Sequence, residues 1–171
     1  MKKIIIAATL VCFSSISVMA QQDHSSHQNQ TSVSKSDTIK LNLTQLLTLY
    51  YDIKDALVKG NANLASTKGE EFVKIANGID YKVISEGNIN ALLKDADKIS
   101  ETRDLTQQRK FFASLSDNMF ALAKALKLST QPIYQAYCPM KKAYWLSREK
   151  DIKNPYFGSA MLTCGSITQT L

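Results

Sequence analysis

The residues best suited to chemistry in this sequence are sulfur residues in its last third. Cys138 is followed by Pro139 and Met140, and Cys164 is preceded three residues earlier by Met161. Thiolates and thioethers are soft donors that suit Cu(I), thiolates also bind zinc, and hard ions such as magnesium prefer oxygen. The sequence therefore predicts a soft-metal site, first of all for Cu(I), with Cys138 and Cys164 as thiolate ligands and Met140 and Met161 as thioether ligands.

The same two cysteines also have a purely structural interpretation. In an exported protein Cys138 and Cys164 can pair as a disulfide, which leaves the methionines as ordinary packing residues. Closing a loop of this length stabilises a fold by roughly 3–4 kcal/mol in the chain-entropy model. The residues alone favour this alternative, a stapled module that docks on an envelope partner and binds no metal. Both interpretations stay open, because a reduced pair binds metal and an oxidised pair does not.

Catalysis is not expected from this sequence. The only histidines, His24 and His27, lie in a polar stretch near the N-terminus, so the folded region offers no Cys-His nucleophile pair. The sequence also lacks a Cys-x-x-Cys redox motif and a glycine-rich phosphate loop. We predict no enzymatic activity, no catalytic residues and no organic cofactor, and we assign His24 and His27 at most an accessory part in metal capture.

The N-terminus has the pattern of an export signal. Two lysines precede an apolar run over residues 4–18, and small residues at 18–20 form a cleavage site. We expect a signal peptide over residues 1–20, which removes Cys12, and a periplasmic mature protein. The apolar run is too short for a stable transmembrane helix, so no stable membrane insertion is expected after cleavage.

Charge argues against a nucleic-acid partner. The chain has 21 basic and 15 acidic residues. Losing the two lysines of the signal leaves a modest excess of four, which is spread along the sequence without a basic stripe. The stretch 21–40 is almost wholly polar and is predicted to be a disordered linker. Residues 41–171 then form one domain.

Helical periodicity dominates the first part of that domain. We expect a first helix that begins at Asn42 and ends at Gly60, and a second that runs from about Ala62 to Asn77 and ends with a left-handed residue at Gly78. A third helix is expected to begin at 85–88, and a fourth to begin after a cap at Asp104. In the last helix apolar residues recur every seven positions, which is typical of a bundle seam and places Met119 in the core. The recurring residues are Leu105, Phe112, Met119 and Leu126.

The expected fold class is all-α, an antiparallel four-helix bundle with a small irregular C-terminal Cys/Met lobe over about 129–171. Within the lobe, residues 133–137 are expected to be extended, 154–158 to form a turn, and 161–167 to form a short strand. Tyr137, Trp145 and Tyr156 are expected to shield the metal site and to hold the lobe on the bundle.

Several motifs of the chain resemble a family of bacterial exported domains of unknown function. The resemblance covers roughly residue 43 to the C-terminus, and the family also occurs fused to periplasmic adaptor subunits of copper/silver-type heavy-metal efflux pumps. It implies a metal role in efflux or homeostasis, with periplasmic efflux subunits as partners. Where other members carry histidines, this sequence has Tyr137 and Phe111. The motifs that carry the resemblance are Ser100–Arg109, Phe112–Ser116, Cys138-Pro-Met140, Trp145–Ser147, Asn154-Pro-Tyr-Phe-Gly158 and Met161-Leu-Thr-Cys164-Gly165.

Overall fold

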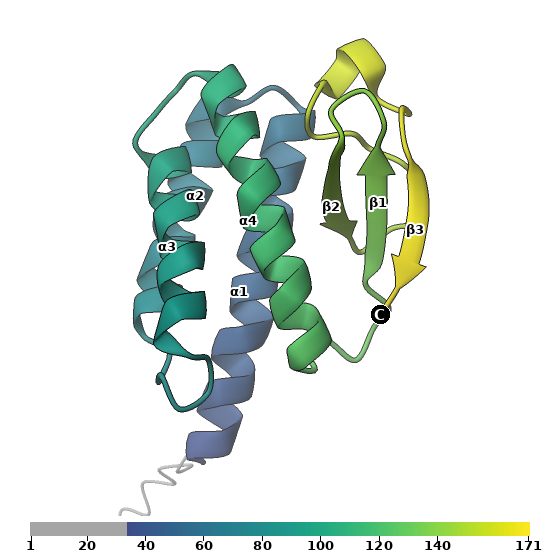
Figure 1. Cartoon of the computed structure of the whole chain (residues 1–171). Helices are drawn as coiled ribbons and strands as arrows, with labels where there is room; N and C mark the ends of the chain where they lie inside the picture. Colours follow the sequence, from purple (N-terminus) through teal and green to yellow (C-terminus); the bar gives the residue numbers. More distant parts are fainter. Residues whose placement is uncertain (1–33) are drawn as a thin grey trace, which may run out of the picture. The chain divides into compact units, whose positions relative to one another are not determined.

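The computed structural model describes residues 34–171 of the chain. The expected signal peptide and most of the expected linker, including His24 and His27, lie outside these residues. Four helices come first and a small antiparallel sheet follows, with consecutive helices running in opposite directions (Figure 1). The helices are α1 (Lys35–Val58), α2 (Ala62–Asn77), α3 (Glu86–Ser100) and α4 (Leu105–Ala125).

Side-chain caps define where three of the helices begin. The side chain of Asn61 accepts a hydrogen bond from the backbone N–H of Leu64 at the start of α2, and Asp104 accepts one from the N–H of Thr106 at the start of α4. Such caps satisfy N–H groups that have no partner within the first turn. The predicted bounds of α2 and the predicted cap at Asp104 are confirmed.

Two predicted helix boundaries are wrong. α1 begins at Lys35 rather than at Asn42, because Ser34 caps it and Ile39 in its second turn packs against the core. The end of the predicted linker is therefore helical. Gly78 follows α2 in a right-handed conformation with φ −85°, so the predicted left-handed stop is absent there.

The C-terminal lobe is not irregular, so the protein is mostly helical but not purely all-α. Three strands form an antiparallel sheet in the order β2-β1-β3. The extended segment expected at 133–137 is confirmed. The strand expected at 161–167 begins only at Ser166, because the short 3-10 helix η1 and a turn occupy the residues before it. The elements are β1 (Tyr134–Cys138), β2 (Ala143–Ser147), η1 (Gly158–Met161) and β3 (Ser166–Thr170).

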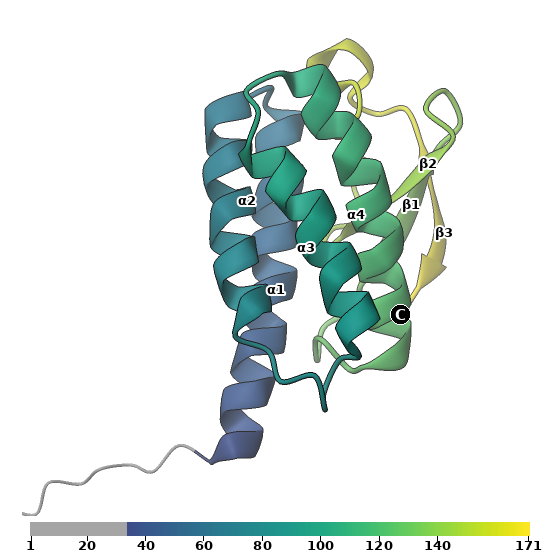
Figure 2. The same ribbon diagram turned by 60° about the vertical axis from the view of Figure 1, so that its left-hand side comes forward.

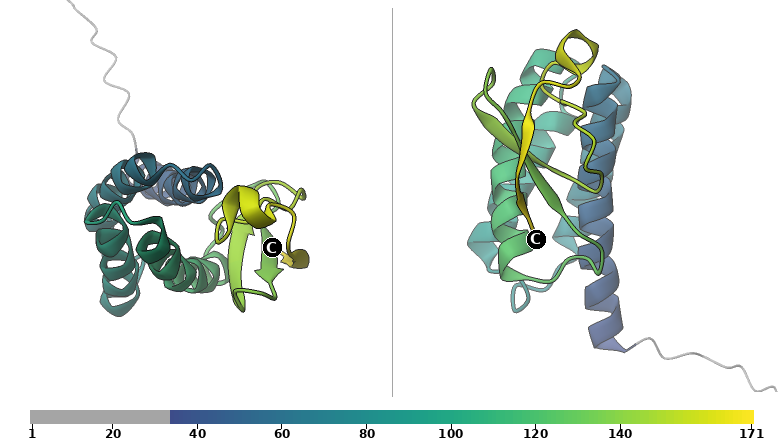
Figure 3. Two further views of the ribbon diagram at one scale, coloured as in Figure 1. Left: turned by 90° about the horizontal axis from the view of Figure 1, so that it is seen from above. Right: turned by 90° about the vertical axis from the view of Figure 1, so that its right-hand side faces the viewer.

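The sheet packs on the side of the helical layer formed by α1 and α4. Figures 2 and 3 show it beside α4, with α2 and α3 on the other side. Helices adjacent in sequence share extensive contacts, whereas α1 and α4 touch each other much less. Strand β2 packs on α4 and completes the core at this seam.

Buried aromatic residues join the sheet to the helices. The rings of Tyr50 and Phe112 stack with centroids 5.1 Å apart, and Tyr156 lies against both Phe112 and Trp145. The hydroxyl of Tyr50 also accepts a hydrogen bond from the N–H of Leu146 at 2.9 Å. Trp145 and Tyr156 are buried, so their predicted role in holding the lobe on the bundle agrees with the packing. The predicted core position of Met119 is confirmed by its complete burial.

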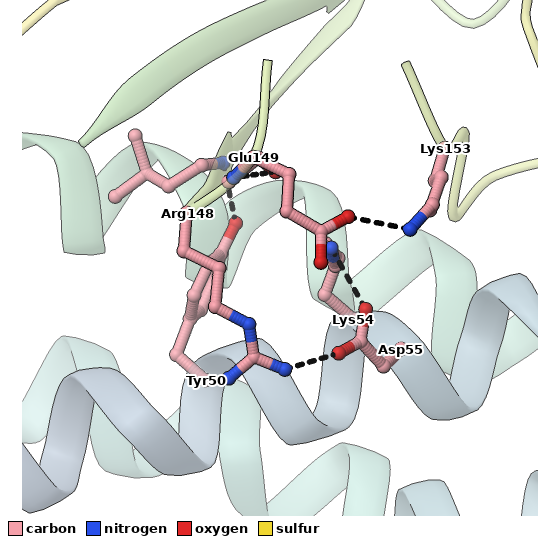
Figure 4. A network of polar contacts seen from close by, with 8 residues as sticks. Tyr50, Lys54, Asp55, Arg148, Glu149 and Lys153 are labelled. Atoms are coloured by element: carbon pink, nitrogen blue, oxygen red, sulfur yellow. Dashed lines mark hydrogen bonds and ion pairs between the residues drawn. The ribbon is translucent and has the colours of Figure 1, made fainter. Parts of the chain in front are cut away.

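A polar network fastens the residues after β2 to α1 (Figure 4). Asp55 binds the almost fully buried Lys54 at 2.7 Å through one carboxylate oxygen and Arg148 at 2.9 Å through the other. Glu149 pairs with Lys153 at 2.5 Å. A buried ammonium needs such a partner, because removal of its charge from water is costly. No helix within residues 34–171 has the length and apolar character needed to cross a membrane.

Candidate functional site: a paired-cysteine turn

The fold brings the two cysteines together, although they are far apart in the sequence. Cys138 is the last residue of β1, and Cys164 lies just before β3, the strand that pairs with β1. Both are free thiols. Cys138 is completely buried, whereas Cys164 is partly accessible. The side-chain amide of Asn154 reaches both residues, since it donates to Cys138 Sγ and to the backbone carbonyl of Cys164.

Two N–H groups donate hydrogen bonds to the sulfur atom of Cys138. The backbone N–H of Lys141 donates to Cys138 Sγ at 3.4 Å, and the side-chain amide of Asn154 donates to the same sulfur at 3.1 Å. Hydrogen bonds of this kind favour the charged form of their acceptor, which for a thiol is the thiolate.

Burial opposes ionisation of the more accessible thiol. Burial raises the pKa of Cys164, and the hydrogen bond to Cys138 and the charge of a Cys138 thiolate raise this pKa further, whereas the Met140 N–H lowers it. A cation bound between the sulfurs would reverse this trend, because a metal ion stabilises the deprotonated form of its thiol ligands.

The two methionines lie on the same two turns but point toward solvent. Met140 is 64% exposed and Met161 is 39% exposed, together with Leu162 at 40%. The backbone ties Met161 to the cysteine pair, since the N–H of Cys164 donates to its carbonyl at 3.1 Å. The structure therefore brings the two predicted thiolate ligands together and leaves both predicted thioether ligands accessible beside them. We call these four residues, Cys138, Met140, Met161 and Cys164, the sulfur cluster.

Asn154 holds the two cysteine segments against each other. It is completely buried, and its amide donates to both Cys138 Sγ and the Cys164 carbonyl, the latter at 2.7 Å. Its side-chain oxygen accepts from the N–H of Tyr156 at 2.8 Å. The hydrogen bonds of this side chain thus go to the sulfur cluster or to the turn that supports it. Sequence reasoning identified Asn154 only as part of a turn.

Arginine and glycine fix that turn on the helices. Arg109 of α4 donates to the carbonyl of Pro155 at 3.0 Å and to the carbonyl of Leu57 at 3.1 Å. Gly158 has φ +56°, and a Cβ there would lie 2.9 Å from both the Arg109 guanidinium and the carbonyl of Val58. Only glycine fits this position without a shift of its neighbours. The Asn-Pro-Tyr-Phe-Gly motif is therefore a support for the cysteine pair.

The glycine that follows the second cysteine, Gly165, is required by the close packing around it. Its φ is +148°, and a Cβ there would lie 2.7 Å from the Trp145 ring and 2.8 Å from the Tyr137 carbonyl. The absence of a side chain lets the segment after Cys164 pack directly on Trp145. Tyr137 is half-buried, and its ring packs against that of Tyr144 with centroids 4.7 Å apart. In the sequence, the only indication of this close packing of backbone on the Trp145 ring is the glycine directly after Cys164.

The fold defines a four-helix domain with a small antiparallel sheet packed on one side. The chain belongs to the family described as protein of unknown function, DUF3347, whose model matches residues 46–131, half of the chain. The matched segment includes most of α1, all of α2 to α4, and ends before β1. The sulfur cluster lies beyond it. No curated protein and no solved structure matches the chain.

Proposed function

We propose that this protein is an exported, non-catalytic protein that binds a soft metal ion, Cu(I) in the first place, in heavy-metal efflux or homeostasis. The observation that carries the proposal is the convergence of two free cysteines, 26 positions apart in the sequence, on the side-chain amide of Asn154. Cys138 and Cys164 would act as thiolate ligands, and Met140 and Met161 would complete the ligand set. In this proposal its partners are periplasmic subunits of an efflux system.

The surroundings of the sulfurs support this choice of ion. Sulfur donors alone suit Cu(I), and two thiolates neutralise the charge of one or two monovalent ions. The N–H donors around the cysteines correspond to the outer hydrogen bonds that orient and tune metal ligands. The accessible thioethers suit an ion that is captured and passed on, because such donors bind weakly and are exposed here.

The alternative function is a stapled interaction module without metal. The convergence of Cys138 and Cys164 on the Asn154 amide supports this alternative too, because a disulfide needs its two cysteines close together. The two functions differ in the working form of the protein: the first needs free thiols and the second needs them paired. A thiol count on protein taken directly from the periplasm separates them.

Anaerobic titration with Cu(I) against a chromophoric chelator tests the proposal. We expect the reduced protein to compete for copper, and we expect Cys138→Ser and Cys164→Ser each to abolish the competition. The double variant Met140→Leu/Met161→Leu should bind more weakly with unchanged stability. Met119→Leu serves as the matched control, because this methionine is buried in the core away from the cluster.

Two results would contradict the metal-binding proposal. One is the absence of competition by fully reduced protein. The other is competition that survives in both serine variants, which would place the copper elsewhere. If, in addition, the periplasmic protein contains Cys138 and Cys164 oxidised to each other, the stapled module becomes the better description.

A further inference from the structure

A cavity of about 280 Å³ opens beside the sulfur cluster, and two positively charged side chains line it. Within residues 34–171, neither Arg109 nor Lys141 lies within ion-pair distance of a carboxylate. The acidic residue nearest to Arg109 in the sequence is Asp104, whose carboxylate caps α4 by accepting a hydrogen bond from the N–H of Thr106. The remaining lining residues are Thr106, Tyr156 and Phe157.

Arg109 is half-buried and has no acidic partner within residues 34–171, which is unfavourable for its positive charge. Two of its N–H groups donate to the carbonyls of Leu57 and Pro155, whereas a guanidinium has five donors in all. Partial burial lowers its pKa, which means that the charged form loses hydration without gaining an acidic partner. Buried charges are ordinarily paired. An anion from outside the described residues would supply the missing partner.

The walls of the cavity indicate which kind of anion fits. The planar fork of a guanidinium matches a carboxylate through two parallel hydrogen bonds. Lys141 adds a second positive charge, and the Thr106 hydroxyl adds a polar group at the rim. Phe157, which is half-buried, offers apolar surface for a carbon skeleton, which a bare inorganic anion would not use. We propose that this cavity, lined by Arg109 and Lys141, binds the carboxylate group of a small organic acid.

This carboxylate pocket is separate from the sulfur cluster but shares Lys141 with it. Lys141 is one of the residues that line the pocket, and its backbone N–H donates to Cys138 Sγ. The proposal does not require bound metal, since none of the four sulfur residues lines the pocket. Its test is therefore made on reduced, metal-free protein, and the result stands whether or not copper binds.

The test follows the side-chain Nε–H of Arg109 in ¹⁵N NMR spectra during titration with sodium succinate. This N–H is held by the carbonyl of Pro155, which slows its exchange with water. Parallel titrations use sodium chloride and sodium phosphate at equal ionic strength. Three variants accompany the wild type: Arg109→Lys, which keeps the charge but loses the fork, Lys141→Gln, and the matched control Lys142→Gln on the neighbouring exposed lysine.

We expect saturable shifts with succinate that exceed those with phosphate and chloride. Lys141→Gln should raise the dissociation constant for succinate by up to about fivefold, the range for an exposed charge, and Lys142→Gln should leave it unchanged. Arg109→Lys should weaken binding further. Because Arg109 also fastens the 154–158 turn, the two lysine variants carry the test if Arg109→Lys fails to fold. Equal shifts in all three salts, tighter binding of phosphate, or equal affinity of the two lysine variants would overturn the proposal.

Discussion

Replacement of Asn154 by alanine should loosen the cysteine turn more than any substitution of an exposed residue. The change removes three hydrogen bonds, from the side-chain amide to Cys138 Sγ and to the Cys164 carbonyl, and from the Tyr156 N–H to the side-chain oxygen. At about 1 kcal/mol for each hydrogen bond, the free energy of unfolding should fall by about 3 kcal/mol. The residue is completely buried, so water cannot easily replace these partners.

Urea unfolding followed by tryptophan fluorescence measures this loss. Trp145 is the only tryptophan and lies buried in β2, so its emission reports on the lobe. Far-UV circular dichroism recorded in parallel reports on the helices. Asn63→Ala is the matched control, because Asn63 is exposed on α2 and its side chain makes no hydrogen bond within residues 34–171. This control should change the free energy of unfolding by less than about 0.5 kcal/mol.

Alkylation of the native protein provides a second readout for Asn154→Ala. In the wild type, buried Cys138 should react much more slowly than Cys164. Without the Asn154 amide, the rate at Cys138 should rise toward that at Cys164. The reasoning is refuted if Asn154→Ala unfolds at the same urea concentration as the wild type and Cys138 stays protected.

Three further predictions concern the packing of the sheet on the helices. Gly165→Ala should lower the free energy of unfolding by about 1–3 kcal/mol, since the new Cβ overlaps the Trp145 ring. Gly87→Ala, in open space on α3, should raise the free energy of unfolding slightly. Chemical denaturation of both variants compares the two effects. Tyr50→Phe should cost about 1–3 kcal/mol because the buried Leu146 N–H loses its acceptor, and an unchanged melting temperature would contradict this. Burial raises the pKa of Tyr50, so the unfolded chain loses the Tyr50 proton at a lower pH than the folded protein does. The contribution of neutral Tyr50 to stability should therefore be complete below pH 10 and be lost as the pH rises above 10. Measurement of the free energy of unfolding between pH 8 and 12 tests whether stability falls in this direction.

The sequence predicts the helices well because their signals are local. Asn61 and Asp104 are caps that act within one turn, and the seven-residue repeat through Phe112 and Met119 marks the buried face of α4. The start of α1 was missed because its first two turns are almost entirely polar. The cap at Ser34 and one apolar contact at Ile39 were sufficient to extend it.

The sheet and the support of the sulfur cluster were harder to predict because they depend on distant contacts. Each strand has only five residues, and β2 owes part of its stability to the bond between Leu146 and Tyr50, 96 positions away. The residue types at Cys138 and Cys164 were enough to suggest that the two sulfurs meet. The role of Asn154 was hidden, because its partners are neighbours only once the three segments have assembled.

The order in which these contacts form has a consequence for the newly made protein. The helices pair mainly with their neighbours in sequence, and such local contacts form quickly. Closure of the lobe needs contacts that span more than 90 positions, such as Tyr50 with Leu146 and Asp55 with Arg148, and the loop entropy makes these slow. The helices therefore assemble first, while Cys138 and Cys164 are still apart and open to outside thiols, oxidants and metal ions. In that interval both sulfurs are accessible, whereas in the finished fold Cys138 is buried and Cys164 stays partly accessible.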